Sequence, residues 1–182
     1  HRAPQAVVTI TQSSELGTAY TIDQLGTLAD HVHAHGLRLH LDGARLANAA
    51  ASLGVALREI TTDVGVDAVS FGGTKNGAMG AEAVVVLNPD LASAVPFLRK
   101  SAMQLASKMR FVSAQLSALL TDDLWLRNAS HANAMARRLE AAVRAIPGVE
   151  VMRRVDANAV FAILPAAVTE RLQRDYRFYT WD

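Results

Sequence analysis

Residues 67–77 read DAVSFGGTKNG, a short apolar segment that runs directly into a glycine-rich turn with a single lysine, Lys75. Residues 37–45, LRLHLDGAR, repeat this design, because an alternating apolar segment there ends in Asp42. Short apolar or alternating segments that end in turn residues are typical of strands in a sheet. Each stretch therefore predicts a strand whose carboxyl end carries a charged side chain.

Helical segments alternate with these two strands and with a third strand expected at residues 7–11. Thr21 is a suitable cap for a helix that Gly36 would end, and residues 44–53 predict a second helix. The first helix has an apolar face, formed by Ile22, Leu25, Ala29 and Val32. This alternation predicts an α/β fold with a mainly parallel sheet, right-handed crossovers and a ligand crevice at the carboxyl ends of the strands.

The rest of the chain predicts one more strand in this sheet and then a smaller layer. Residues 81–87 follow the lysine turn after a link too short for a helical crossover, so we expect them to pair antiparallel. Residues 91–146 are helical in composition, with breaks near Pro96 and at 121–123. The tail predicts a small α+β layer, with strands at 149–153, 159–164 and 177–181 and a helix at 166–175.

Composition limits the class of protein. The 182 residues are 51% hydrophobic and 19% charged, which is typical of a globular protein rather than a disordered one. A net charge of +1 with scattered arginines argues against a nucleic-acid surface. The absence of cysteine excludes a disulfide framework and a thiolate nucleophile. Because no apolar run reaches about 18 residues, we expect no membrane span and interpret the protein as cytoplasmic.

Lysine, aspartate and arginine at neighbouring strand ends suit one cofactor, pyridoxal 5'-phosphate. Lys75 would form its Schiff base and Asp42 would pair with its pyridinium nitrogen, while Arg45 would meet the phenolate oxygen or a substrate carboxylate. Two plainer interpretations remain open: Lys75 as a surface lysine in a turn, and Asp42 as the cap of a helix that starts at Ala44. A nucleotide phosphate loop fits less well, because GGTKNG lacks the G-x-x-x-x-G-K-[ST] order.

Further polar residues lie near these three. Ser70 and Thr74 offer hydroxyls for the cofactor phosphate. His40 shares the strand face of Asp42 and could orient its carboxylate, or it could be an ordinary core histidine. Gln12, at the end of the first strand, could face a cofactor oxygen or the substrate hydroxyl.

The glycines around the lysine are expected to allow the cofactor to approach closely; they are Gly72, Gly73 and Gly77. We predict no metal site, because the histidines on the expected helices lack an acidic partner at metal-ligand spacing. These histidines are His31, His33, His35 and His131.

Residues 40–49, HLDGARLANA, and 67–86, DAVSFGGTKNGAMGAEAVVV, resemble the threonine aldolase and β-eliminating lyase family of pyridoxal-phosphate enzymes. The resemblance extends from Val7 to Tyr179. It implies the PLP-dependent transferase fold of type I. Residues 1–122 would be the later part of the large cofactor-binding domain, and residues 123–182 a connecting helix and part of the small C-terminal domain.

The resemblance also implies features outside these motifs. A phosphate loop and a histidine that stacks on the ring would lie upstream of His1, and a carboxylate-binding arginine beyond Asp182. Many relatives carry serine or threonine three residues before the lysine, where this chain has Gly72.

The activity that the resemblance implies is cleavage of a β-hydroxy-α-amino acid, of the L-threonine or L-allo-threonine type, to glycine and an aldehyde. The partners would be this small amino-acid substrate and further copies of the chain, in a homodimer or homotetramer. Two alternatives remain open. One is another β-eliminating lyase or a phenylserine-type aldolase, and the other is an incomplete fragment that serves only as a scaffold.

Overall fold

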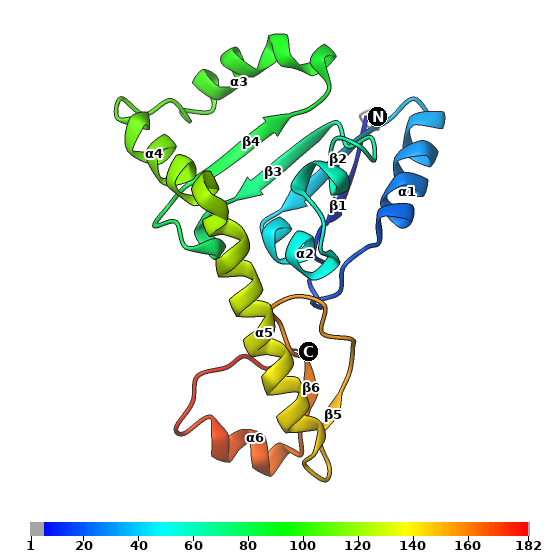
Figure 1. Ribbon diagram of the computed structural model, residues 1–182, viewed down its shortest axis with the longest axis vertical. Coiled ribbons are helices and arrows are strands. Elements are labelled where there is room, and N and C mark those ends of the chain that lie inside the picture. Colours follow the sequence, from blue (N-terminus) through cyan, green and yellow to red (C-terminus); the bar gives the residue numbers. More distant parts are fainter. Residues whose placement is uncertain (1–5, 182) are drawn as a thin grey trace, which may run out of the picture.

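The computed structural model describes residues 6–181 and has a four-stranded sheet at its centre (Figure 1). The strand order is β1 (Val7–Thr11), β2 (Arg38–Gly43), β3 (Ala68–Gly72) and β4 (Glu82–Val86). The first three strands are parallel, and β4 is antiparallel to β3. The predicted α/β sheet is therefore confirmed, including the antiparallel strand after the lysine turn.

Helices connect the parallel strands. α1 (Ile22–Ala34) joins β1 to β2, and α2 (Leu46–Leu53) and a short 3₁₀ helix, η1 (Leu57–Ile60), lie between β2 and β3. α1 begins with a capping box, in which the side chains of Thr21 and Gln24 each accept a hydrogen bond from the other's backbone N–H. The cap at Thr21 thus lies where the sequence predicted it.

The core lies between one face of the sheet and these helices. Leu39 and Leu41 of β2 are fully buried there. The predicted apolar face of α1 is also buried, except for Ile22, which is 37% exposed. Because side chains alternate along a strand, His40 and Asp42 lie on the face of β2 that points away from this core.

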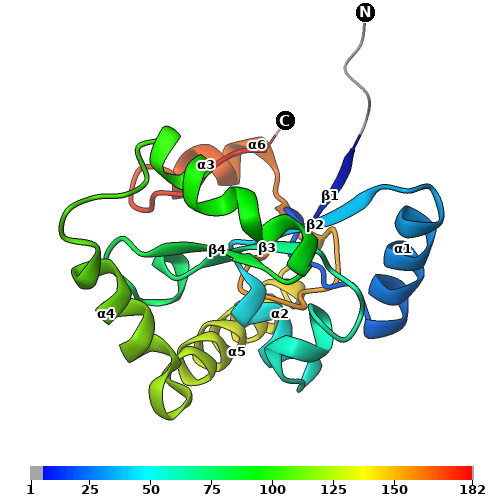
Figure 2. The same cartoon turned by 90° about the horizontal axis from the view of Figure 1, so that it is seen from above.

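The middle of the chain is helical. After β4 come a 3₁₀ helix and four further helical segments, namely η3 (Pro89–Ala94), α3 (Val95–Ser101), α4 (Met109–Leu120), η4 (Thr121–Asp123) and α5 (Leu124–Arg144). The break at 121–123 was predicted, whereas the break between α3 and α4 was not; Met103 there adopts a left-handed φ of 55°. Figure 2 shows α2 and α5 on the same side of the sheet. Within residues 6–181, no helix is both long and apolar enough to cross a bilayer.

The last part of the chain forms a small layer at the far end of α5 (Figure 1). It contains the antiparallel strands β5 (Glu150–Val151) and β6 (Ala162–Ile163), followed by α6 (Ala166–Leu172). The predicted strands at 149–153 and 159–164 are thus much shorter. The predicted strand at 177–181 is wrong, because within the described part of the chain no neighbouring strand pairs with it.

The small layer contacts the loop that follows β1. Gly17 O accepts the backbone N–H of Ala157 at 3.0 Å, and the Ala19 N–H donates to Asp156 Oδ2 at 3.0 Å. A side chain at Gly17 would meet Ala159, since an added Cβ would lie 3.0 Å from Ala159 O. The loop after β1 is therefore held against residues 156–159 of the small layer.

A buried carboxylate just before β3 links α1, β2 and the loop after β4, at the opposite end of these strands from Asp42. Asp67 is 4% exposed and accepts hydrogen bonds from the Leu39 N–H (2.7 Å), Asn88 Nδ2 (2.6 Å) and His33 Nε2 (2.8 Å). His33 thus has an acidic hydrogen-bond partner, although the two residues are 34 positions apart and not at the metal-ligand spacing on which the prediction was based. Burial raises the pKa of Asp67. The hydrogen bonds from Asn88, Leu39 and His33 together lower it by more than burial raises it, so this pKa lies below its usual range.

Candidate active site

The turns that follow β2 and β3 lie in direct contact. In the parallel register Asp42 is opposite Ser70. A Cβ added to Gly72 would lie 2.8 Å from both Cα and O of Ala44, and one added to Gly43 would lie 2.9 Å from Ser70 O. Both glycines are therefore required for the two strand ends to approach this closely. As predicted, the turn that begins at Asp42 lies against the end of the strand that leads to Lys75.

The glycines around the lysine are packed against protein atoms, so the expectation that they make room for a cofactor is wrong. Besides the contact at Gly72, a Cβ on Gly73 would lie 2.5 Å from Ala81 O. A Cβ on Gly77 would lie 2.8 Å from Asn128 Nδ2. This packing also explains why the chain has glycine three residues before the lysine, because no side chain fits there.

Asp42 caps the turn and keeps one oxygen available. Its Oδ1 accepts the Ala44 N–H at 3.0 Å within the turn. Asp42 is thus not a helix cap, the plainer interpretation that the sequence left open, because α2 starts at Leu46 and its N-cap residue is Arg45. Its Oδ2 has no hydrogen-bond partner among residues 6–181, although the side chain is half-buried. A half-buried carboxylate with a free oxygen is a suitable partner for a protonated ring nitrogen.

Arg45 ends the same turn. It is the N-cap residue of α2, so the helix starts at Leu46 rather than at Ala44 as predicted. Arg45 is half-buried, and within the described residues its guanidinium forms no ion pair or hydrogen bond. An uncommitted guanidinium beside Asp42 can bind a carboxylate or phenolate oxygen.

Lys75 lies in the middle of a 3₁₀ turn, η2 (Thr74–Asn76), that follows β3. Gly73 O accepts the Asn76 N–H at 3.0 Å and closes the turn. Lys75 and Thr74 are exposed, whereas Asn76 is buried. The lysine side chain is therefore accessible to a ligand while the turn that carries it is anchored.

His40 and Ser70 bond to each other. His40 Nε2 lies 2.9 Å from Ser70 Oγ on the neighbouring strand. Within the described residues no hydrogen bond joins His40 to Asp42, so the structure does not show the first of the two roles that the sequence left open for His40. Sharing a strand face put the two side chains on the same side, but the histidine reaches across to β3 instead. A phosphate contact by Ser70 or Thr74 stays a prediction.

Gln12 is turned into the protein. It is fully buried, its Nε2 donates to Tyr20 O and its Oε1 accepts the Tyr20 N–H, both at 3.0 Å. In this structure it closes the loop 12–20 rather than facing the site, and its predicted contact with cofactor or substrate stays a prediction. Ser13 Oγ beside it is buried and has no hydrogen-bond partner among residues 6–181.

Two residues near the lysine were not singled out from the sequence. Asn76 donates from Nδ2 to Trp125 O at 3.0 Å, and Asn128 of α5 donates from Nδ2 to Asn76 O at 2.8 Å. Asn128 is 52 positions away along the chain. The one signal in the sequence is an asparagine inside a helix, a residue that lowers helix stability relative to alanine.

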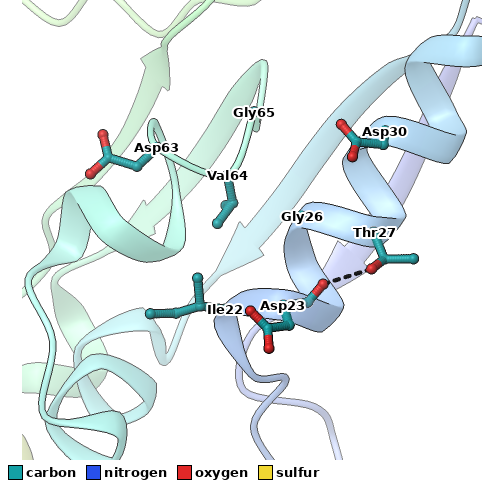
Figure 3. Close-up of a pocket in the computed structure, with 8 residues that line it drawn as sticks. All are labelled: Ile22, Asp23, Gly26, Thr27, Asp30, Asp63, Val64 and Gly65. Atoms are coloured by element: carbon teal, nitrogen blue, oxygen red, sulfur yellow. Dashed lines mark hydrogen bonds between the residues drawn. The ribbon is translucent and has the colours of Figure 1, made fainter.

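A shallow hollow elsewhere contains none of the predicted site residues. It lies between α1 and the loop at residues 63–65, has a volume of about 560 Å³ and is lined partly by Asp23, Asp30 and Asp63 (Figure 3). Asp63 is already paired with Arg58 at 2.8 Å. Across residues 6–181, no group of three or more His, Cys, Asp or Glu side chains is arranged to hold a metal ion.

Comparisons with known proteins identify the family of the chain. The family model described as "Beta-eliminating lyase" matches residues 1–167. The chain is 46% identical over 182 residues to the low specificity L-threonine aldolase of Pseudomonas aeruginosa, covering 100% of this chain and 53% of that protein. The same identity and coverage hold for the low specificity L-threonine aldolase of a Pseudomonas species. The chain thus spans about half the length of the curated relatives it matches.

Solved structures confirm the predicted fold. The threonine aldolase of Leishmania major superimposes with a TM-score of 0.89 and 32% identity, covering 97% of this chain and 52% of that one. The tryptophan decarboxylase of Catharanthus roseus superimposes with a TM-score of 0.62 at 17% identity, covering 89% of this chain and 38% of that one, which is evidence for the fold alone. The chain has part of the large domain of fold type I.

Proposed function

Because the chain belongs to the beta-eliminating lyase family, we propose that it supplies the lysine and aspartate of a pyridoxal-phosphate-dependent aldolase. The reaction is cleavage of a β-hydroxy-α-amino acid, of the L-threonine or L-allo-threonine type, to glycine and an aldehyde. The observation that carries the proposal is the contact between the Asp42–Arg45 turn and the Gly72–Lys75 turn. The names of the relatives at 46% identity support the substrate class.

The residues present fit the cofactor. The free Oδ2 of Asp42 would bind the ring nitrogen, the Lys75 amine the carbonyl carbon, and Arg45 the phenolate oxygen or the substrate carboxylate. Thr74 and Ser70 are proposed for the phosphate. When bound, pyridoxal phosphate supplies an electron-withdrawing ring that accepts the electron pair of the broken Cα–Cβ bond.

Each side chain then has a defined task. Asp42 keeps the ring nitrogen protonated, because a carboxylate in a half-buried position favours the cationic form of its partner. Arg45 orients a substrate carboxylate by paired N–H donors. The Lys75 amine would hold the cofactor between turnovers and would take the place of the product amine when glycine leaves. The group that takes the proton of the substrate β-hydroxyl is not among the residues assigned.

The same residues would serve another β-eliminating lyase or a phenylserine-type aldolase, which is the second candidate function; the description of the family favours it. We further propose a large domain over residues 1–122, a partial small domain over 123–182, a cytoplasmic location, and a homodimer or homotetramer. Large apolar side chains on and beside α3 and α4 support association with further protein, because Phe97 is 74%, Met103 88% and Phe111 58% exposed.

The test is glycine release from L-threonine, L-allo-threonine and L-phenylserine. We expect the 182-residue chain alone to bind the cofactor weakly and not to turn over, and a form extended at both ends to the length of its relatives to be active. In the extended form Lys75→Ala should abolish activity, while Lys100→Ala, a change of an exposed lysine on α3, should leave it unchanged. An active Lys75→Ala variant would refute the proposal.

A further inference from the structure

The start of α5 holds the lysine turn at the residue next to Lys75. Asn76 is 6% exposed, and its side chain donates to Trp125 O at 3.0 Å. Asn128, one helical turn further along α5, donates to Asn76 O at 2.8 Å. A single helix thus satisfies a side-chain donor and a backbone acceptor of the residue beside the lysine.

Gly77 provides a second, independent observation that the turn packs against Asn128. Its φ of +112° lies in the left-handed region that favours glycine, and an added Cβ would lie 2.8 Å from Asn128 Nδ2. A side chain at this position would displace the asparagine amide. The backbone of the turn and the amide of Asn128 therefore fit together in one arrangement.

The same helix is anchored to the aspartate side of the site. Asn133 of α5 and Asn48 of α2 are 1% and 2% exposed. Asn48 Nδ2 donates to Asn133 Oδ1 at 3.0 Å, and Asn133 Nδ2 donates to Asn48 O at 2.9 Å. Because α2 starts directly after Arg45, α5 has a fixed position relative to the turn that carries Asp42.

Packing alone does not explain these asparagines. Asparagine lowers helix stability relative to alanine, and a buried amide is tolerated only when its groups are bonded. Asn128 directs its donor to the turn of Lys75. A role in fixing that turn accounts for the residue type, the direction of the hydrogen bond and the glycine opposite it.

We infer that Asn128 is a positioning residue for Lys75. Through it, α5 fixes the lysine turn at one distance from the Asp42 turn, so that the amine and the carboxylate reach the same cofactor. The inference rests on the proposed function for the role of Lys75, but the hydrogen bond to Asn76 can be tested without it.

Two variants separate the hydrogen bond from the volume of the side chain. Asn128→Ala removes both, whereas Asn128→Asp keeps the shape and, when ionised, has no donor for Asn76 O. Ser130→Ala changes an exposed residue on the same helix and is the matched control. Circular dichroism identifies a temperature at which all four proteins are folded.

The first measurement is hydrogen exchange at the Asn76 and Ala78 amides, both of which donate to Gly73 O within the turn. We expect both Asn128 variants to exchange about fivefold to tenfold faster than the parent there, and Ser130→Ala to match the parent. The second, made in the form extended to the length of its relatives, is pyridoxal phosphate labelling fixed by borohydride, read as the ratio of label on Lys75 to label on Lys100. This ratio should fall about fivefold or more in both variants.

A merely structural role would lower the melting temperature and leave the labelling ratio of the folded protein unchanged, which would overturn the inference. Parent-like exchange in Asn128→Asp would also overturn it, because the donor would then be dispensable. If the parent itself shows no preference for Lys75, the proposed function fails at its lysine. The exchange measurement then still decides whether Asn128 holds the turn.

Discussion

Replacing Gly72 by alanine tests whether the two turns pack as the structure shows. The added Cβ would lie 2.8 Å from both Cα and O of Ala44 and 3.1 Å from its carbonyl carbon. Carbon atoms in favourable contact are about 3.5 Å or more apart, so one turn must move by more than about half an ångström. Overpacking of this kind costs about 1–3 kcal/mol.

Thermal unfolding followed by circular dichroism measures this cost. For a chain of this length, each 1 kcal/mol corresponds to about 2–4 °C in Tm, so we expect Gly72→Ala to unfold about 4–8 °C below the parent for a cost of about 2 kcal/mol. Gly26→Ala is the control. Gly26 lies inside α1 with no atom within 4 Å of an added Cβ, so alanine there should stabilise the protein by about 1 kcal/mol.

The two variants make the same chemical change with opposite expected signs. A Gly72→Ala protein as stable as the parent would show that the Ala44 backbone does not lie against Gly72. The contact between the two strand ends would then no longer support the proposed site. Destabilisation by both variants would instead point to a general effect of adding a methyl group.

Two further predictions concern carboxylates. Asp42→Asn, in the form extended to the length of its relatives, should lower turnover about a hundredfold at saturating cofactor, because a neutral amide loses ~3 kcal/mol of transition-state stabilisation; equal turnover would remove Asp42 from the site. Asp67→Asn should lower the free energy of unfolding by about 1–3 kcal/mol at pH 7, because a buried carboxylate with three donors is replaced. Since the folded pKa of Asp67 is lowered, its contribution is present above the unfolded pKa and is lost as pH falls through the folded pKa. The difference between parent and Asp67→Asn in urea midpoints should therefore shrink on acidification, and a constant difference from pH 7 to pH 3 would contradict this account.

Local patterns were enough to predict the sheet. The alternation of strands with helices predicted the three parallel strands, and the short link after Lys75 predicted the antiparallel β4. The small layer was predicted less well, because a strand exists only where a partner pairs with it. Residues 177–181 have a suitable composition but no neighbouring strand within the described chain.

Within the candidate site, the sequence indicated which strand ends lie side by side but not how their turns are held. Asp42 and Lys75 could be placed together because the carboxyl ends of parallel strands share one edge of a sheet. The partner of His40 could not, because it depends on the register of β3. Asn128 was missed because its contact joins positions 52 apart. The role of Gly72 and Gly77 was interpreted wrongly because the atoms packed against them belong to Ala44 and Asn128, which lie in other elements of the fold.

The most direct test of the central claim is the site of covalent labelling by pyridoxal phosphate. The chain has three lysines, Lys75, Lys100 and Lys108, and each of them is exposed, so accessibility alone would not favour one of them. In the form extended to the length of its relatives, which we expect to bind the cofactor, borohydride reduction and peptide mapping should place the pyridoxyl mass on Lys75, in at least tenfold excess over Lys100 and over Lys108. An equal distribution over the three lysines, or a preference for Lys100 or Lys108, would contradict the account.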